Sequence, residues 1–503
     1  MARTVLLECI TVVVGLFALV GAAEGLRRGL SLSREFSRKA VHFLIAVPVL
    51  FLPGSGLERA TLIIVPCLFI PLLLAAVLSG RLKPLHAARR SYGTVFYALG
   101  FLLLVIGFYP ARPFFLIVPM LVLCLGDSLA ALPGERFRRV HDYIPVGDRK
   151  TVEGSFVMGL VSTAVTFAAL SLADRFPGGV PPVGSPAEAL ILSAAVGSAA
   201  AVAEALSRKG SDNLSIPVVT AAVLWLYFAQ EAPSPGRLLA SGVLSALFGV
   251  ASVRLRLVTV AGAMAMAVLG LFLYGLGGFV WTIPLLAFFA SAGALSALNR
   301  RRKAGVAYET EKGGPRDALQ VLANGGVPLL FFLLRQVTGN PAFLYGFLAS
   351  AAAAAADTWA TELGVFSRRR PVGILTGKAV ERGMSGGVSV LGTVASAAGS
   401  LTTVLAGRPL AARMTGQAMG TDLFLIASAC GFVGALFDSM LGATLQGTYR
   451  CGRCGKLTEK AVHCGTGGHP LVSGRRWMTN DGVNFSGFAL AGILGAVLGA
   501  VSA

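Results

Sequence analysis

Gly126-Asp127-Ser128-Leu129-Ala130 and Ala356-Asp357-Thr358-Trp359-Ala360 are two acidic stretches, 230 positions apart, in a chain that is otherwise strongly apolar. A serine follows each aspartate at the same distance of 28 residues, Ser155 in the first case and Ser385 in the second. Similar residues at similar spacings predict an internal duplication with one polar site in each copy. Carboxylates within lipid-embedded protein are costly and usually functional, so both stretches are candidate site residues.

The composition excludes an ordinary soluble domain. Of the 503 residues, 55% are hydrophobic and 13% are charged, which is about half the usual charged fraction. Apolar runs near membrane-spanning length recur between short polar segments, and we expect about sixteen spans, about eight in each half. The predicted fold class is all-α: a polytopic membrane protein of two parallel, diverged repeats, 1–230 and 237–503. The segment between them contains two prolines and a glycine that interrupt the apolar pattern.

The net charge of +19 is distributed in a way that argues against a nucleic-acid partner. The cations stand in short clusters at the ends of apolar runs, in every second loop, instead of forming one basic surface. By the positive-inside rule these loops are cytoplasmic, which places both termini outside and the polar motifs on the cytoplasmic face. We expect a multi-pass protein of a prokaryotic plasma membrane. The positive charge would have a second use in attracting anionic lipids or phosphorylated substrates.

Polar residues of the first half gather at the ends of apolar runs. Arg38 and His42 share one helical face, and the segment 147–155 mixes carboxylates, cations, hydroxyls and glycines. Glu204 supplies a further carboxylate on the same side. Oxygen ligands suit Mg²⁺, and cations and helix-start amides suit phosphate, so the mixture predicts a metal-nucleotide site. A basic interfacial anchor and simple helix capping by residues of 148–155 are the alternatives.

The second half repeats this mixture with more glycine. A glycine-rich helix start at 383–389 is preceded by Lys378 and Arg382, which indicates phosphate recognition. Close helix packing through small residues is the competing explanation for the glycines. No Gly-x₄-Gly-Lys-Ser/Thr string occurs, so the sequence does not support a standard P-loop for ATP.

The loop 446–480 contains a separate group of soft ligands. Three of the seven cysteines lie within 451–464, on a loop expected in the reducing cytoplasm, where disulfides are rare. Cys451, Cys454, His463 and Cys464 are candidate ligands of a structural zinc ion, because Cys-x₂-Cys is common in such sites. Free thiols beside a basic loop are the alternative, and we expect no catalytic role for zinc.

Two resemblances follow from these motifs. Residues from about 30 to 220 resemble the phytol kinase and dolichol kinase family. The match rests on Arg38 with His42, on Arg90, on 126–130, on Asp212-Asn213 with Pro217 and, most specifically, on Lys150-Thr151-Val152-Glu153-Gly154-Ser155. Residues from about 255 to 500 resemble the integral-membrane family that includes plant phytyl-phosphate kinase, through 356–364 and Gly383-Met384-Ser385-Gly386-Gly387-Val388-Ser389.

Together the resemblances imply a CTP-dependent prenol kinase fused to a prenyl-phosphate kinase. The first half would phosphorylate a long-chain isoprenoid alcohol, such as phytol or geranylgeraniol, and the second would convert the monophosphate to the diphosphate. His42 is the candidate general base, because an alcohol nucleophile benefits from deprotonation and an anionic phosphate acceptor does not need it. The expected cofactors are Mg²⁺ and CTP as phosphoryl donor, with zinc as a possible structural ion.

The expected roles divide into three sets. The catalytic candidates are His42, Asp127, Lys150, Glu153, Asp357, Glu362 and Asp438. The candidates for nucleotide or phosphate binding are Arg38, Arg90, Ser128, Thr151, Ser155, Asp212, Asn213, Arg316, Asn324, Lys378, Arg382, Ser385, Asn480 and Asn484. The candidate Mg²⁺ ligands are Asp127, Glu153, Asp212, Asp357 and Asp438.

Two other classes of protein fit parts of this pattern. A transporter also uses parallel repeats and intramembrane acids, but transport needs access from both faces and the polar motifs cluster on one. Cytidylyl transfer to a phospholipid would use the same nucleotide and metal and would release pyrophosphate. The cytoplasmic clustering favours an enzyme, and the oligomeric state stays open.

Overall fold

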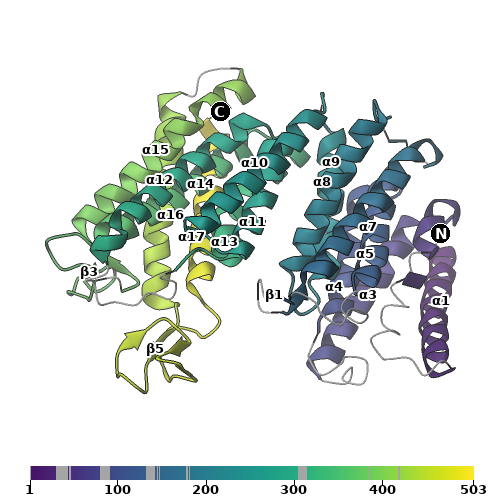
Figure 1. Ribbon diagram of the computed structural model, residues 1–503, viewed down its shortest axis with the longest axis horizontal. Helices are drawn as coiled ribbons and strands as arrows, with labels where there is room; N and C mark the ends of the chain where they lie inside the picture. The colour runs from purple at the N-terminus through teal and green to yellow at the C-terminus, as the bar shows by residue number, and fades with distance from the viewer. Residues whose placement is uncertain are drawn as a thin grey trace. The chain divides into compact units, whose positions relative to one another are not determined.

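The computed structural model describes residues 2–29, 43–44, 47–79, 91–131, 142–143, 146, 148–176, 179–180, 182–230, 232–303, 314–382, 384–416 and 420–502. The expected site residues Arg38, His42 and Arg90 lie outside the described residues. The described chain is mostly α-helical (Figure 1). It divides into two compact units, 1–240 and 241–503.

The first unit is built around one buried helix, α5 (Phe114–Ala130). Every side chain from Phe114 to Cys124 is buried, and α5 contacts α4, α7 and α9. The elements of this unit are α1 (Ala2–Gly29), the 3₁₀ turn Leu52–Gly54, α3 (Arg59–Leu78), α4 (Gly93–Phe108), α5, β1 (Asp142–Tyr143), β2 (Lys150–Thr151), α7 (Val152–Ser171), the 3₁₀ turn Ala173–Arg175, α8 (Pro186–Ala205) and α9 (Asp212–Phe228). The acidic motif 126–130 is therefore the end of the central helix.

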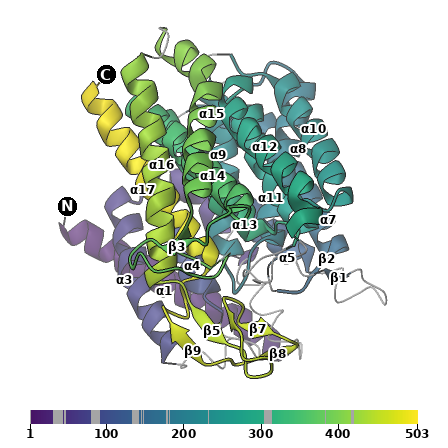
Figure 2. The same cartoon turned by 90° about the vertical axis from the view of Figure 1, so that its left-hand side faces the viewer.

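The second unit has the same kind of centre in α14 (Ala342–Gly364), which contacts α12, α13, α15, α16 and α17. The helices of this part are α10 (Pro235–Arg254), α11 (Val260–Gly270) with the π-helical turn Leu271–Leu276, α12 (Phe279–Lys303), α13 (Ala318–Thr338), α14, α15 (Val390–Thr415), α16 (Thr421–Thr444) and α17 (Asn480–Ser502). Its strands are β3 (Val372–Gly373), β4 (Gly387–Val388), β5 (Thr448–Arg450), β6 (Leu457–Thr458), β7 (Val462–His463), β8 (Thr466–Gly467) and β9 (Leu471–Ser473). Figures 1 and 2 show β5 to β9 gathered beyond one end of α16.

Small residues allow the neighbouring helices to approach α14 closely. A Cβ atom at Gly399 of α15 would lie 3.0 Å from the Ala355 carbonyl oxygen, and one at Gly431 of α16 would lie 2.6 Å from the Ala352 Cβ. Packing of backbones through glycine and alanine is a usual way for membrane helices to associate. Helix packing thus explains Gly399 and Gly431, which lie outside the glycine-rich segment 383–389.

The two units share an order of elements. In each, a buried helix ends in the acidic motif, an antiparallel hairpin follows (β1 with β2, β3 with β4), and three further helices complete the group. The helix after each hairpin has a hydroxyl N-cap: Thr151 accepts from the Gly154 amide, and Ser389 accepts from the Gly392 amide. Hydroxyl caps of this kind satisfy an otherwise unpaired amide.

The 28-residue spacing that suggested the duplication joins positions that are not equivalent. Ser155 lies in the first turn of α7, whereas Ser385 lies ahead of β4, in the hairpin before α15. The caps Thr151 and Ser389 are the positions that occupy the same place. The duplication itself stays a prediction, now resting on the order of elements instead of on that spacing.

Among the described residues, ten helices are long and apolar enough to cross a membrane. Four shorter apolar helices accompany them: Gly93–Phe108, Phe114–Ala130, Asp212–Phe228 and Val260–Leu276. A helix of about 20 residues spans the hydrocarbon core. The described chain therefore has the elements of a multi-pass protein, and the expected number of about sixteen spans stays a prediction.

Candidate functional site

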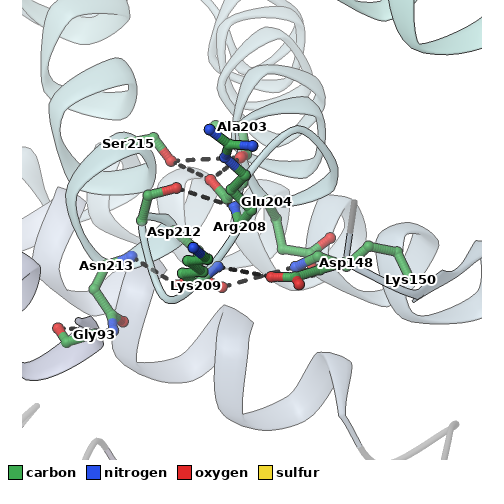
Figure 3. A network of polar contacts seen from close by, with 12 residues as sticks. Gly93, Asp148, Lys150, Ala203, Glu204, Arg208, Lys209, Asp212, Asn213 and Ser215 are labelled. Atoms are coloured by element: carbon green, nitrogen blue, oxygen red, sulfur yellow. Dashed lines mark hydrogen bonds and ion pairs between the residues drawn. The ribbon is translucent and has the colours of Figure 1, made fainter. Parts of the chain in front are cut away.

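A buried ion-pair cluster forms in the first unit where three elements end or begin. Lys150 of β2 places its Nζ 2.5 Å from Glu204 Oε1 near the end of α8 and 3.7 Å from Asp212 Oδ2 at the start of α9. Figure 3 shows these residues side by side. Burial alone would lower the pKa of Lys150, but Glu204 and Asp212 raise it above its usual value. The ammonium group is therefore charged and held in place.

Two hydroxyl groups join the hairpin to this cluster. Ser155 donates through its Oγ to Glu204 Oε2 at 3.3 Å, and Tyr143 OH lies 2.6 Å from Ser155 Oγ. Ser155, expected to bind phosphate, thus contacts the carboxylate that pairs with Lys150. Thr151 has a structural role in this position, since its hydroxyl caps the N-terminus of α7.

The turn between α8 and α9 is fixed from two sides. The Lys209 amide donates to Asp148 Oδ2 at 2.7 Å, and the Lys209 carbonyl accepts from the Tyr92 amide at 2.9 Å. Asn213, 2% exposed, donates through its side chain to the Gly93 carbonyl at 3.1 Å. The side-chain nitrogen of Asn213, a residue expected to bind nucleotide or phosphate, is therefore bound to the start of α4. Asp148, considered as a helix cap, binds the Lys209 amide.

The acidic motif of the first unit lies beside this cluster. Asp127 is close enough to Lys150 to interact with its charge, and Ser128 is 9% exposed. Glu153 lies in the first turn of α7. The structure therefore places Asp127, Lys150 and Asp212 close together, with Glu204 as a direct partner of the lysine, and their expected roles in catalysis and in binding nucleotide and Mg²⁺ stay predictions.

A cavity of about 280 Å³ opens in the second unit at the ends of α14 and α16. Of the ten residues of this half expected in catalysis or in binding nucleotide or phosphate, nine line it: Arg316, Asn324, Asp357, Glu362, Arg382, Ser385, Asp438, Asn480 and Asn484. Lys378 is exposed on the hairpin between β3 and β4 and does not line the cavity. Residues from sequence positions 316 to 484 thus meet in one polar chamber.

Among the described residues, four carboxylates line this cavity: Asp357, Glu362, Asp438 and Glu459. Asp438, 9% exposed, is close enough to Asp357 and to Glu459 to interact with the charge of each. Asn484, with its amide nitrogen turned toward Asp438, donates to Asp438 Oδ2 at 2.9 Å. Arg316 is close enough to Glu362 and Asp357 to interact with the charge of each. The lining thus combines these four carboxylates with two guanidinium groups, those of Arg316 and Arg382.

Two buried polar atoms of the cavity have no hydrogen-bond partner among the described residues. They are Asn324 Oδ1, an acceptor, and Gln446 Nε2, a donor, on side chains that are 8% and 3% exposed. Buried polar groups in proteins are nearly always bonded to protein or to ordered molecules. These two atoms therefore offer an acceptor and a donor to a molecule or ion within the cavity.

Glu362 is anchored from a neighbouring helix. Ser296 of α12 donates to Glu362 Oε1 at 2.8 Å, and the Asn299 side chain donates to the Glu362 backbone carbonyl at 3.1 Å. Both bonds hold the end of α14 against α12. The cavity wall at Glu362 is consequently part of the helix packing.

The glycine-rich segment passes close to α16. Gly386 has a φ of +77°, and a Cβ there would lie 2.4 Å from the Ala443 Cβ. Only glycine fits both the left-handed backbone and this approach. The neighbouring Ser385 donates to Glu459 Oε1 at 2.5 Å. Glu459, 5% exposed, lines the cavity and is a site residue that the sequence analysis missed.

The cysteine and histidine side chains of the loop 446–480 also come together. The ligand atoms of Cys451, Cys454, His463 and Cys464 all lie within 4.8 Å of one another. Hydrogen bonding from His463 lowers the pKa of Cys451 to about 6. The expected zinc ligands are thus neighbours in space, and the zinc itself stays a prediction.

Helices of spanning length with carboxylates buried among their ends define the class of the molecule: a multi-pass integral membrane protein. A family model described as integral membrane protein DUF92 matches residues 243–492. The chain belongs to this family of integral membrane proteins, since it also covers most of the length of relatives that are at least 30% identical.

Three relatives show the range of similarity. The chain is 38% identical to a phytol kinase of Synechocystis over 224 residues, which are 41% of this chain and 86% of that protein. It is 30% identical to Protein PGR of Arabidopsis thaliana over 280 residues, 52% of this chain and 96% of that protein. It is 33% identical to the uncharacterized membrane protein MJ0933 of Methanocaldococcus jannaschii over 186 residues, 37% of this chain and 73% of that protein. No solved structure matches the chain significantly.

Proposed function

We propose that this protein is a membrane kinase that phosphorylates a long-chain isoprenoid alcohol and then the resulting monophosphate. CTP is the proposed phosphoryl donor and Mg²⁺ the proposed cofactor, with the first unit making the monophosphate and the second the diphosphate. The observation that carries the proposal is the 38% identity to a phytol kinase over 86% of that protein's length. Both sites are proposed to face the cytoplasm.

Lys150 is the proposed phosphate ligand of the first unit. Its ammonium group is charged and fixed by Glu204 and Asp212, so little side-chain freedom is lost when a phosphate binds. A positive charge next to the transferred group stabilises the charge that develops there. Asp127 lies beside Lys150 and is a proposed Mg²⁺ ligand. His42 is the proposed base for the alcohol, with Arg38 and Arg90 as further phosphate ligands.

The donor set of the second cavity fits Mg²⁺. Asp357, Asp438 and Glu459 supply carboxylate oxygens at close quarters, and Asn324 presents an acceptor oxygen with no partner among the described residues. Mg²⁺ prefers such oxygen ligands and usually binds through one or two carboxylates together with substrate phosphate. When bound, Mg²⁺ would neutralise phosphate charge and relieve the repulsion between the carboxylates.

The cations of the second cavity suit an acceptor that is already phosphorylated. Arg316 and Arg382 both line the cavity, and guanidinium groups bind phosphate in a two-pronged way. An anionic phosphate acceptor needs no general base, and no histidine is present among the described residues that line this cavity. These features support the second step for this unit.

The test uses the purified full chain in lipid vesicles with labelled CTP and either phytol or geranylgeraniol. Prenyl mono- and diphosphate are expected products. Asp127→Asn should abolish the monophosphate but still convert supplied prenyl monophosphate, and Asp357→Asn should accumulate the monophosphate. Asp422→Asn is the matched control, because Asp422 is an exposed carboxylate in the first turn of α16.

Other products would overturn the proposal. Substrate uptake into the vesicles without phosphorylation would identify a transporter. Release of pyrophosphate with transfer of CMP to a phospholipid would identify a cytidylyltransferase. Loss of both phosphorylation steps in either aspartate variant would contradict two independent sites.

A further inference from the structure

The four soft ligands of the loop 446–480 stand at the separations of a tetrahedral metal site. His463 Nδ1 lies 3.6 Å from Cys454 Sγ and 3.3 Å from Cys464 Sγ, and all four ligand atoms lie within 4.8 Å of one another. Tetrahedral zinc with usual bond lengths places nitrogen and sulfur ligands ~3.5 Å apart and two sulfurs ~3.8 Å apart. The two nitrogen–sulfur distances agree with this geometry, and the 4.8 Å limit leaves the sulfurs within a small movement of it.

The backbone holds the first pair of ligands in a tight turn. The Cys451 amide donates to the Lys456 carbonyl and the Gly455 amide donates to the Cys451 carbonyl, both at 2.9 Å. Gly455 has a φ of +73°, which closes the turn directly after Cys454. This Cys-x₂-Cys-Gly turn points both thiols to the same side.

The second pair of ligands lies at the hairpin of β7 and β8 and is tied to the first. Arg453 donates through Nη1 to the Cys464 carbonyl at 3.1 Å. The ring of His469 lies 3.3 Å from the His463 amide and 3.4 Å from the Gly452 amide. The two turns are therefore assembled around one point by bonds that do not use the ligand atoms Cys454 Sγ and Cys464 Sγ.

Glu459 lies between these two pairs of ligands along the chain. It follows β6 directly, and β6 pairs with β5, which leads into Cys451. From there its carboxylate reaches the cavity and accepts from Ser385 at 2.5 Å. The strands of the loop have two or three residues each, and sheets this small are marginal without another stabilising element.

We propose that Cys451, Cys454, His463 and Cys464 bind one zinc ion and that this ion holds Glu459 at the lining of the cavity. The ion is structural, because protein ligands fill all four tetrahedral positions. Thiolate and imidazole ligands select zinc over Mg²⁺ and Ca²⁺, which prefer oxygen. The proposal stands without the kinase function, since it concerns only metal content and the position of one loop.

The first experiment measures metal in the purified full chain. One zinc per chain is expected by elemental analysis, and a Cys454→Ser plus Cys464→Ser double variant should lose it. Cys67→Ser is the matched control, because Cys67 is an exposed cysteine on α3 outside the cluster. Replacement of zinc by Co²⁺ in the wild-type protein should give the absorption bands of a tetrahedral cobalt thiolate. Zinc below a tenth of the protein concentration, with no cobalt bands, would overturn the metal site.

The second experiment tests the position of Glu459 in the wild-type chain, without relying on a variant that folds. Hydrogen exchange is compared for zinc-loaded protein, for protein treated with a chelator and for treated protein with zinc restored. Chelation should speed exchange at least tenfold in 448–473 and also in 384–389, where Ser385 binds Glu459, and zinc should reverse both changes. Exchange in α5 of the other unit is the internal control.

Zinc binding and the positioning of Glu459 by zinc can be refuted separately. If zinc is present and its removal changes 448–473 but leaves 384–389 unchanged, the link to the cavity is wrong. A Glu459→Gln variant should keep one zinc per chain while exchange in 384–389 rises. Unchanged exchange there would also contradict the role of Glu459.

Discussion

Replacement of Lys150 by methionine separates the structural from the chemical role of the ion-pair cluster. The side chains of Lys150, Glu204 and Asp212 are 15%, 12% and 19% exposed. Removing the ammonium that pairs with both carboxylates takes this positive charge away from two acidic side chains that lie largely out of water. Breaking a buried pair in this way costs about 3–5 kcal/mol. Glu204 still accepts from Ser155, so we expect a loss of about 3 kcal/mol in the free energy of unfolding.

A double variant provides the decisive comparison. Lys150→Met with Glu204→Gln removes the orphaned charge nearest the lysine, and we expect it to recover about 2 kcal/mol of the lost stability. Phosphorylation should stay absent in the double variant, because the phosphate ligand is still missing. Stability is measured by denaturant titration in detergent micelles, and product formation by the labelled-CTP assay.

The control variant for Lys150→Met replaces a cation that is exposed. Arg208→Met removes an exposed cation from the neighbouring turn and should change stability by less than about 0.5 kcal/mol. If Lys150→Met costs no more than this control, the cluster is not a buried ion pair in the membrane. If the double variant recovers activity together with stability, Lys150 serves folding and does not bind phosphate.

Further predictions concern the cavity and the packing around it. Gly386→Ala should lower the free energy of unfolding by about 2 kcal/mol or more through strain and overlap, whereas Gly377→Ala, also at positive φ but with open space around it, should cost only about 1 kcal/mol in the same titration. Asn213→Ala should cost about 1–2 kcal/mol, seen as earlier thermal unfolding, because a buried carbonyl loses its donor. Asp438→Asn should raise stability by removing a buried carboxylate that interacts unfavourably with Asp357 and Glu459, and it should weaken Mn²⁺ binding, measured by electron paramagnetic resonance; unchanged Mn²⁺ affinity would exclude Asp438 as a ligand.

Residues of the second cavity were predictable because polar groups in spans are rare. Asp357 and Asp438 stand out in apolar helices, and an unpaired carboxylate there is so costly that it marks a site. Asn324 and Asn484 follow by the same reasoning. Nine of the ten residues expected in catalysis or in binding nucleotide or phosphate consequently line one cavity, although they are spread along the chain from Arg316 to Asn484.

The contacts that could not be predicted from the sequence arise from packing between segments far apart in the chain, which leaves little trace in the local sequence. Lys150 pairs with Glu204, 54 positions away, and only the packing of α7 on α8 brings them together. Glu459 belongs to a loop whose strands are too short to show a period. Composition could have identified Glu459 as a site residue, because it is a lone acidic residue between Lys456 and Lys460 in a basic loop.

The alanine-rich segment at the centre of α14 has an implication for how the chain tolerates change. Residues 349–356 contain only alanine and one serine, and every side chain is fully buried. Alanine has no side-chain rotamers to lose or exchange, so neighbouring helices pack directly against the backbone of α14. A larger side chain here would overlap with those helices. A stretch that looks like low-complexity sequence is therefore expected to be among the least substitutable in the protein. Random mutagenesis should find this repetitive segment almost as intolerant as the aspartate that follows it.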